Sequence, residues 1–213
     1  MTERENPDTW RVTVMAAREP MSEPMSDDRT AIPGKPPFTV DDMLKFPEDG
    51  NRYELLNGSL LVSPAPTPLH QDALLELATI LRVASPPELK PMLEVNLRLG
   101  PQDYYIPDLV VVSKAAMRST ELMFEAKDIL LAVEIVSPST QMRDRQIKKA
   151  VYAAAGIPLY WRIELLESPS LFIYQLGDEE YDLAEEVKAG DTARLSVPFP
   201  VEFDPIQLVT DWV

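Results

Sequence analysis

The run of aliphatic and β-branched residues at 129–137 (ILLAVEIVS) constrains the fold more than any other segment of this 213-residue chain. Its length and composition are typical of a strand that is buried on both faces, and Pro138 ends it. A second dense run, DLVVVS at 108–113, has the same character. Strands of this kind need other elements packed over both faces of their sheet.

Helical periodicity supplies those elements. Leu74, Leu77, Ala78 and Leu81 recur at 3.6-residue spacing within 70–83, which predicts an amphipathic helix that ends before Ser85-Pro86-Pro87. The segment 141–155 shows the same spacing and stops at Gly156. Further strands are expected at 93–99, 159–165 and 170–176, and a hairpin at 52–63 around Asn57-Gly58. The pattern predicts an α/β (α+β) domain with a central mixed β-sheet flanked by helices.

The domain is expected to cover residues 38–213, after a disordered N-terminal arm of residues 1–37. The arm mixes Pro, Ser, Met and charged residues without periodicity. The domain begins near Phe38, where Thr39 and Asp42 have the spacing of a helix cap. From Asp178 onward, ten acidic residues stand against Lys188 and Arg194, and we interpret this run as a solvated face.

Composition excludes several classes of site. With no cysteine and a single histidine, His70, the chain has no thiolate zinc site, no thiol nucleophile and no multi-histidine centre, so a metal must be held mainly by oxygen. A triad with His70 as base is formally open, but no G-x-S-x-G motif accompanies it. No apolar stretch could span a membrane and no secretion signal opens the chain, so a cytoplasmic protein is expected. The net charge of -15 argues against a broad nucleic-acid footprint.

Two carboxylates stand in runs that should be buried. Asp108 precedes Leu-Val-Val-Val, and Glu134 lies inside LLAVEIV. A buried carboxylate needs a partner, a proton or a metal ion. Taken singly, Asp108 is equally well explained as a turn or cap residue, and Glu134 as an edge residue or one member of a salt bridge. Together, on strands that are plausible neighbours, they indicate a site.

A third candidate group comes from the helix that follows. Asp144, Lys148 and Tyr152 are spaced i, i+4, i+8 and therefore share one helix face. The alternative is an exposed ion pair with an aromatic ring at the edge of the core, and for Asp144 that alternative is favoured.

Five segments in this order resemble the Uma-type family of restriction endonuclease-like proteins, a bacterial branch of the PD-(D/E)XK nuclease superfamily. They are RYELLNG, SPAPTPLHQ, IPDLVVVS, LAVEIVSPST and DRQIKKAVYAAAGIPLYWRI. The resemblance covers residues 38–210 and implies a restriction endonuclease-like core. It departs from the family pattern at Leu159 and Glu164, where the family has an acidic residue and an aspartate.

The resemblance also implies roles for individual residues. Asp108 and Glu134 would bind a divalent metal ion, with the Ile135 carbonyl as a further ligand. The lysine that the superfamily places two residues after the glutamate is replaced here by Val136, and Lys148 on the next helix would take its place. Glu54 would be a further acidic residue of the site. His70 falls on a family motif without an assigned role.

The leading hypothesis is a Mg²⁺- or Mn²⁺-dependent DNA endonuclease with a metal-activated water as nucleophile. The alternative is a catalytically inactive nuclease-fold module that works through binding or protein contacts. A third hypothesis is glycoside hydrolysis by paired carboxylates. It requires a sugar cleft lined by aromatic residues, for which the sequence gives insufficient evidence. Because a duplex cutter with one site per chain must act twice, a homodimer is expected. The acidity predicts weak, salt-dependent and metal-dependent DNA binding, and no membrane association.

Overall fold

The computed structural model describes residues 32–47, 49–63, 65–137 and 143–212. Most of the predicted disordered arm, up to residue 31, lies outside the described residues. Of the remaining arm residues, Ile32 packs against a small cluster that contains Phe38, Val40, Leu55 and Tyr104. The predicted boundary of the domain at residue 38 therefore stays a prediction.

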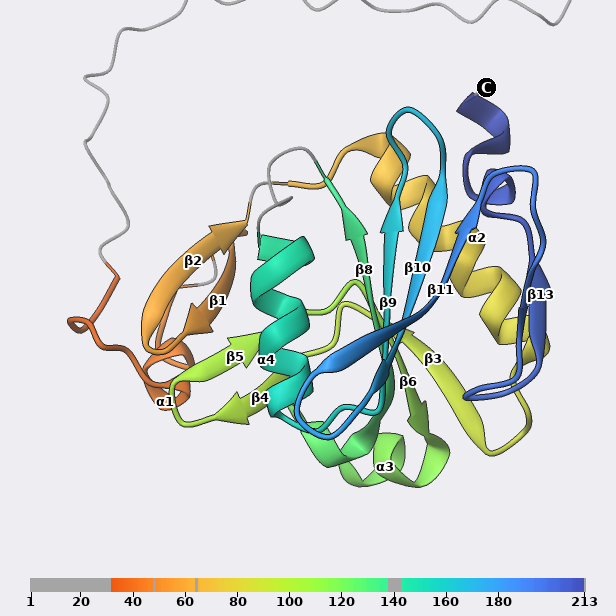
Figure 1. The fold of residues 1–213 in the computed structure, drawn as a ribbon. Coiled ribbons are helices and arrows are strands. Elements are labelled where there is room, and N and C mark those ends of the chain that lie inside the picture. Colours follow the sequence, from red (N-terminus) through yellow and green to blue (C-terminus); the bar gives the residue numbers. More distant parts are fainter. Residues whose placement is uncertain (1–31, 48, 64, 138–142, 213) are drawn as a thin grey trace, which may run out of the picture. The chain divides into compact units, whose positions relative to one another are not determined.

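A six-stranded mixed sheet forms the centre of the domain, as the sequence predicts (Figure 1). The central pair, β8 and β9, is parallel, and every other neighbouring pair is antiparallel. Of the eight residues of β8, seven are buried, in agreement with a strand covered on both faces. The order across the sheet is β11 (Tyr181–Lys188), β10 (Ser170–Leu176), β9 (Leu159–Glu164), β8 (Ile129–Val136), β6 (Leu109–Ser113) and β3 (Leu89–Leu93).

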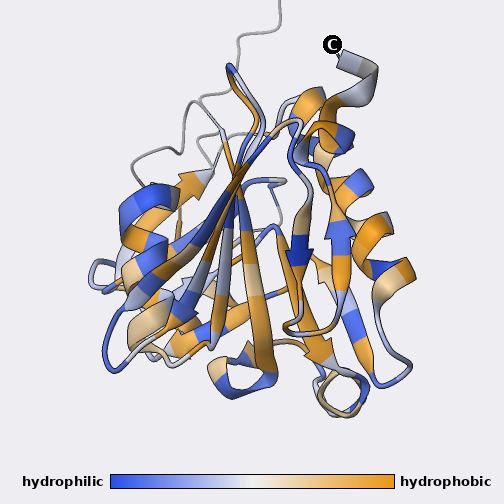
Figure 2. Ribbon diagram, turned by 45° about the vertical axis from the view of Figure 1, so that its right-hand side comes forward, coloured by the Kyte–Doolittle hydropathy of each residue, from blue (hydrophilic) through white to orange (hydrophobic). Residues whose placement is uncertain are grey.

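Two helices cover the opposite faces of this sheet (Figure 1). Helix α2 (Pro68–Ala84) buries Leu74, Leu77 and Leu81 in a core shared with one set of alternating strand residues. Helix α4 (Lys148–Ala154), preceded by a π-helical turn at Arg143–Ile147, packs Tyr152 and Ala153 against the other set. Figure 2 shows the hydrophobic strands at the centre and the alternation of hydrophobic and hydrophilic residues along α2. The predicted α+β architecture is confirmed.

A second sheet lies beside the first and was not expected from the sequence. Its order is β2 (Ser59–Ser63), β1 (Arg52–Leu56), β5 (Asp103–Tyr105), β4 (Leu97–Gly100) and β7 (Phe124–Glu125). The single strand predicted at 93–99 is wrong. The chain turns at Glu94, which has a φ of 49°, so that β3 ends in the first sheet and β4 belongs to the second. The two sheets meet at this corner.

Local sequence signals begin and end the elements near the site. Thr39 and Asp42 form the predicted capping box of α1 (Val40–Met43). Asn57 and Gly58, with φ of 48° and 74°, make the predicted tight turn between β1 and β2. No helix within the described ranges is both long and apolar enough to cross a membrane. The remaining short elements are α3 (Lys114–Ser119), η1 (Ala126–Asp128), β12 (Ala193–Leu195), β13 (Val201–Phe203) and η3 (Pro205–Trp212).

Candidate active site

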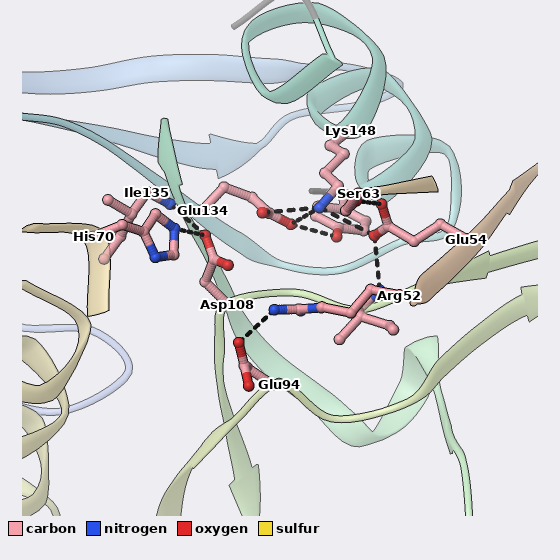
Figure 3. A network of polar contacts seen from close by, with 11 residues as sticks. Arg52, Glu54, Ser63, His70, Glu94, Asp108, Glu134, Ile135 and Lys148 are labelled. Atoms are coloured by element: carbon pink, nitrogen blue, oxygen red, sulfur yellow. Dashed lines mark hydrogen bonds and ion pairs between the residues drawn. The ribbon is translucent and has the colours of Figure 1, made fainter. Parts of the chain in front are cut away.

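The four predicted site residues lie in one polar network where the two sheets and α4 meet (Figure 3). Glu54 comes from β1, Asp108 directly precedes β6, Glu134 lies in β8, and Lys148 is the first residue of α4. All four are buried, with exposed fractions between 1% and 8%. An isolated buried charge is costly. The charges of these four buried side chains must therefore be balanced by opposite charges or hydrogen bonds within the network.

Strand register brings the two candidate ligands together. In the antiparallel pair of β6 and β8, Leu109 lies opposite Val133, so the same register continued by one residue would bring Asp108, just before β6, opposite Glu134. Directly opposite residues project from the same face of a sheet. The backbone N–H of Ile135 also donates a hydrogen bond of 2.8 Å to Oδ2 of Asp108. The segments IPDLVVVS and LAVEIVSPST, distant in sequence, therefore place their carboxylates side by side.

The ammonium group of Lys148 connects the two acidic sides of the network. Its Nζ lies 2.9 Å from each carboxylate oxygen of Glu134 and 3.2 Å from Oε1 of Glu54. The hydroxyl of Tyr152, one helical turn further along α4, donates a 2.7 Å hydrogen bond to Oε1 of Glu134. The i, i+4 spacing of Lys148 and Tyr152 thus directs both side chains to the same carboxylate. The side chain of Asp144 lies outside the described residues.

Glu54 is held from a second direction. Its Oε1 accepts a 2.9 Å hydrogen bond from the backbone N–H of Ile106, in the segment that leads from β5 to Asp108. The central position of Glu54 in β1 follows from the hairpin register, in which it pairs with Leu61. The hairpin therefore fixes one carboxylate of the network.

His70 contacts the site from the other face of the sheet. It lies in the first turn of α2, and its Nε2 is 3.2 Å from Oδ2 of Asp108. Burial by itself lowers the pKa of His70, but the hydrogen bond and charge of Asp108 outweigh it and raise that pKa above its ordinary value. Burial likewise opposes the ionised form of Asp108, yet His70, Lys148 and the Ile135 N–H together lower the pKa of Asp108. The carboxylate of Asp108 is therefore stabilised as an anion.

Arg52 and Glu94 extend the network toward the surface. Their side chains form an ion pair, and both are about one-third exposed. Glu94 occupies the turn between β3 and β4, and its backbone N–H donates a 3.1 Å hydrogen bond to the carbonyl of Asp108. Sequence reasoning missed this pair. The RYELLNG segment contains Arg52, but its partner lies 42 residues away and has no motif of its own.

Four basic residues, Arg143, Arg145, Lys148 and Lys149, form a cluster in the sequence of α4 and the turn before it, and this cluster is largely engaged within the protein. Arg145 forms a bidentate contact with Glu164, and Nζ of Lys149 lies 4.4 Å from the centre of the Tyr174 ring. Lys148 is buried in the network. The side chain of Arg143 lies outside the described residues. The described members of this cluster thus do not form a free basic patch.

The chemistry of the donor set suits a hard divalent cation. Mg²⁺ takes one or two protein carboxylates with waters in its remaining positions, and Asp108 and Glu134 provide two. Oδ1 of Asp108 has no hydrogen bond or ion pair with any described residue. The described residues contain no group of three or more His, Asp or Glu side chains arranged to hold a metal. A bound ion would therefore rely on the two carboxylates, a backbone carbonyl and water.

Comparisons with known proteins agree with this fold. The model of the Uma2 family, described as "putative restriction endonuclease", matches residues 40–209. Among solved structures, a protein from Anabaena variabilis ATCC 29413, described as a putative nuclease belonging to DUF820, matches with a TM-score of 0.68. The two chains are 21% identical, and the match covers 81% of this chain and 98% of the other. A comparison with curated proteins found no match.

Proposed function

The chain belongs to the Uma2 family, and on that premise we propose that it is a DNA endonuclease that depends on Mg²⁺ or Mn²⁺. The observation that carries the proposal is the placement of Asp108, directly before β6, and of Glu134, in the neighbouring strand β8, close to the buried cation of Lys148. Nuclease chemistry accounts for a network of this kind, because a metal ion and a fixed positive charge near the reacting phosphate both promote phosphodiester hydrolysis.

Asp108, Glu134 and the carbonyl of Ile135 would hold the ion. When bound, the ion supplies a water of lowered pKa and offsets negative charge on the reacting phosphate. Lys148 would orient that water and offset further negative charge. Glu54 accepts a hydrogen bond from Ile106 and an ion pair from Lys148, so it would keep the ammonium group in place. Burial of all these groups limits competition from bulk water.

Cleavage of plasmid and single-stranded DNA with Mg²⁺ or Mn²⁺ tests the proposal. Asp108→Asn and Glu134→Gln should each reduce cleavage to background, because each removes one charged ligand of the ion. Glu186→Gln is the matched control, since Glu186 is an exposed carboxylate on β11 that is remote in the sheet order from β6 and β8. Cleavage at the wild-type rate by both site variants would contradict the assignment of Asp108 and Glu134 to the active site.

A second candidate is a nuclease-fold binding module without activity. It is favoured by one observation: both oxygens of Glu134 already contact Lys148, and Tyr152 donates to one of them. A carboxylate held in this way must give up or share contacts to ligate an ion. Calorimetric titration with Mn²⁺ separates the two candidates, because only the nuclease requires binding that disappears in Asp108→Asn and Glu134→Gln.

We further propose that the protein acts on DNA as a homodimer. A single site per chain cuts one strand, and two-fold pairing would present two sites to a duplex. Light scattering at working concentration measures the mass directly. A monomer that nevertheless makes double-strand breaks would contradict this part of the proposal.

A further inference from the structure

His70 is the single histidine of the chain, and the proposed chemistry leaves it without a role. We propose that His70 is a positioning residue: its Nε2–H holds Oδ2 of Asp108 and so leaves Oδ1 free to bind the divalent cation. This inference rests on the proposed function, because it assigns His70 a part in shaping the same metal site. It also states that the imidazole itself does not ligate the ion.

The two oxygens of Asp108 have different surroundings. Oδ2 lies 2.8 Å from the N–H of Ile135 and 3.2 Å from Nε2 of His70. Oδ1 has no such contact within the described parts of the chain. Two donors on one oxygen fix the rotation of the carboxylate group, because turning it would leave the Ile135 N–H and the His70 N–H unpaired in the protein interior. Oδ1 is therefore the oxygen that is presented for a ligand.

The opposite nitrogen of the imidazole argues against direct ligation. Nδ1 of His70 is buried and has no hydrogen-bond partner among the described residues. A histidine that binds a metal through Nε2 carries its proton on Nδ1, and that proton normally goes to a carboxylate, a carbonyl or water. Here the proton would lie on a buried, unpaired nitrogen. A proton on Nε2 instead leaves only an unused acceptor at Nδ1 and gives Asp108 its donor.

The backbone around His70 suits a positioning role. Thr67 caps α2 and accepts a 3.3 Å hydrogen bond from the backbone N–H of His70. The same helix is fixed to the sheet by Leu74, Leu77 and Leu81, each no more than 2% exposed. The side chain of His70 itself is 9% exposed. A buried imidazole on the capped first turn of a packed helix has little freedom to move away from Asp108.

Nitrogen NMR of the metal-free protein tests which nitrogen is protonated. The full chain, produced without a polyhistidine tag and labelled with ¹⁵N, contains one imidazole, so its long-range ¹H–¹⁵N pattern belongs to His70. We expect a proton on Nε2, with a shift that changes in Asp108→Ala. A neutral ring protonated on Nδ1, with a bare Nε2, would overturn the proposal.

Mn²⁺ binding tests the consequence for the site. His70→Leu removes the donor and should weaken Mn²⁺ binding about 10–100-fold, the usual effect of losing a group that orients a metal ligand. His70→Gln keeps an N–H at the end of a side chain of similar reach and should retain affinity within a few-fold. Tyr181→Phe, which deletes the buried 2.7 Å hydrogen bond to the Ile157 carbonyl, is the control for a loss of stability without a change in Mn²⁺ affinity.

Pulsed EPR of the Mn²⁺-loaded wild type provides a direct readout. Because the chain has one histidine, an imidazole ¹⁴N coupling would identify His70 as a ligand and overturn the positioning role. Its absence, together with rescue by His70→Gln, supports that role. If the wild type binds no Mn²⁺, the proposed function fails, and an Nε2–H hydrogen bond seen by NMR would then be a structural contact only, which also rejects the positioning role.

Discussion

At the scale of single residues, the site depends on one buried cation between two carboxylates. Lys148 is 3% exposed, and Glu134 and Glu54 are equally enclosed. A buried set of ion-paired side chains is costly to desolvate, so its presence is weak evidence for stability. Removal of one of the charged side chains, however, leaves the remaining charges buried without a counter-charge. The effect of the network on the stability of the fold therefore depends on all of its charged side chains being present.

Lys148→Met is expected to destabilise the protein by about 3–5 kcal/mol, because it leaves two carboxylates buried without their shared cation. Urea unfolding followed by circular dichroism measures the change. Lys148→Met combined with Glu134→Gln should recover part of the loss, since one of the two charges is then absent. The Lys127→Met control breaks an exposed ion pair with Glu125 and should have little effect. Equal stability of Lys148→Met and the wild type would show that the two acids are neutral.

At the scale of elements, the β1–β2 hairpin positions Glu54 and Arg52 at the site. Its turn packs closely against Phe38 and the β4–β5 turn: Phe38 N–H donates to the Gly58 carbonyl, and Gly58 N–H donates to the Gln102 carbonyl. A Cβ on Gly58 would lie 2.6 Å from Cβ of Pro37 and 3.0 Å from the carbonyl oxygen of Phe38. Gly58 is thus required by space as well as by its φ of 74°.

Gly58→Ala should destabilise the protein more than Gly50→Ala, by about 1–3 kcal/mol, because only Gly58 adds overpacking to the cost of a positive φ. Gly50 is the matched control: its φ is 80°, and no described atom lies within 4 Å of an added Cβ. Thermal or urea unfolding of both variants provides the comparison. Equal losses of stability in the two variants would indicate that the backbone around Pro37 can shift to make room for the added Cβ without a cost in free energy.

Most elements could be predicted because their signals are local. The periodicity of α2, the Asn57-Gly58 turn and the apolar run of β8 each depend on residues within one segment. The turn at Glu94 could not be predicted, since a glutamate at φ of 49° is stabilised by a contact with Asp108, fourteen positions away. The short β5 and β7 are also set by pairing with distant partners rather than by their own composition.

For the candidate site, too, residues marked by a local signal could be predicted, and contacts between distant segments could not. Asp108 and Glu134 could be selected because carboxylates are unexpected in apolar strands, and Lys148 because the resemblance to the family indicated it. The contact of His70 with Asp108 depends on the packing of α2 against the sheet, which no local pattern encodes. For Tyr152, the sequence left a place on the same helix face as Lys148 and a place at the edge of the core both open; the residue is fully buried and donates a hydrogen bond to Glu134. The helical periodicity predicted which face of the helix carries Tyr152, but its hydrogen-bond partner Glu134 is determined by tertiary packing.

At the scale of the whole molecule, the acidic charge is concentrated away from the site. Strand β11 exposes six of its eight residues, among them Asp182, Glu185 and Glu186, at the edge of the sheet opposite β3. Within the site, the charges of Glu54 and Glu134 are offset by Lys148. A net charge of -15 therefore opposes DNA binding mainly through long-range repulsion, which salt screens. Under the proposed function, contacts with the ion and the reacting phosphate would therefore have to supply most of the affinity for DNA.

A chain of tyrosine rings joins the second sheet, α4 and the central sheet. The rings of Tyr105, Tyr152 and Tyr160 follow one another at centroid distances of 5.9 and 5.8 Å, and Tyr160 stacks at 5.6 Å on both Tyr174 and Tyr181. Burial raises the pKa of Tyr105, Tyr152, Tyr174 and Tyr181 above the ordinary value of 10.0. Ionisation of these phenols is therefore coupled to the integrity of the whole domain.

This coupling predicts alkaline unfolding in a single step. The folded protein keeps protons that the unfolded chain releases near pH 10, so stability is fully present below about pH 10 and falls as the pH rises above it. Absorbance at 295 nm should remain low until the domain unfolds and then rise together with the loss of circular dichroism. Tyr181→Phe removes one of these phenols and should weaken the dependence of stability on pH above 10. Gradual ionisation of the tyrosines while the circular dichroism of the folded protein persists would contradict the burial of this cluster.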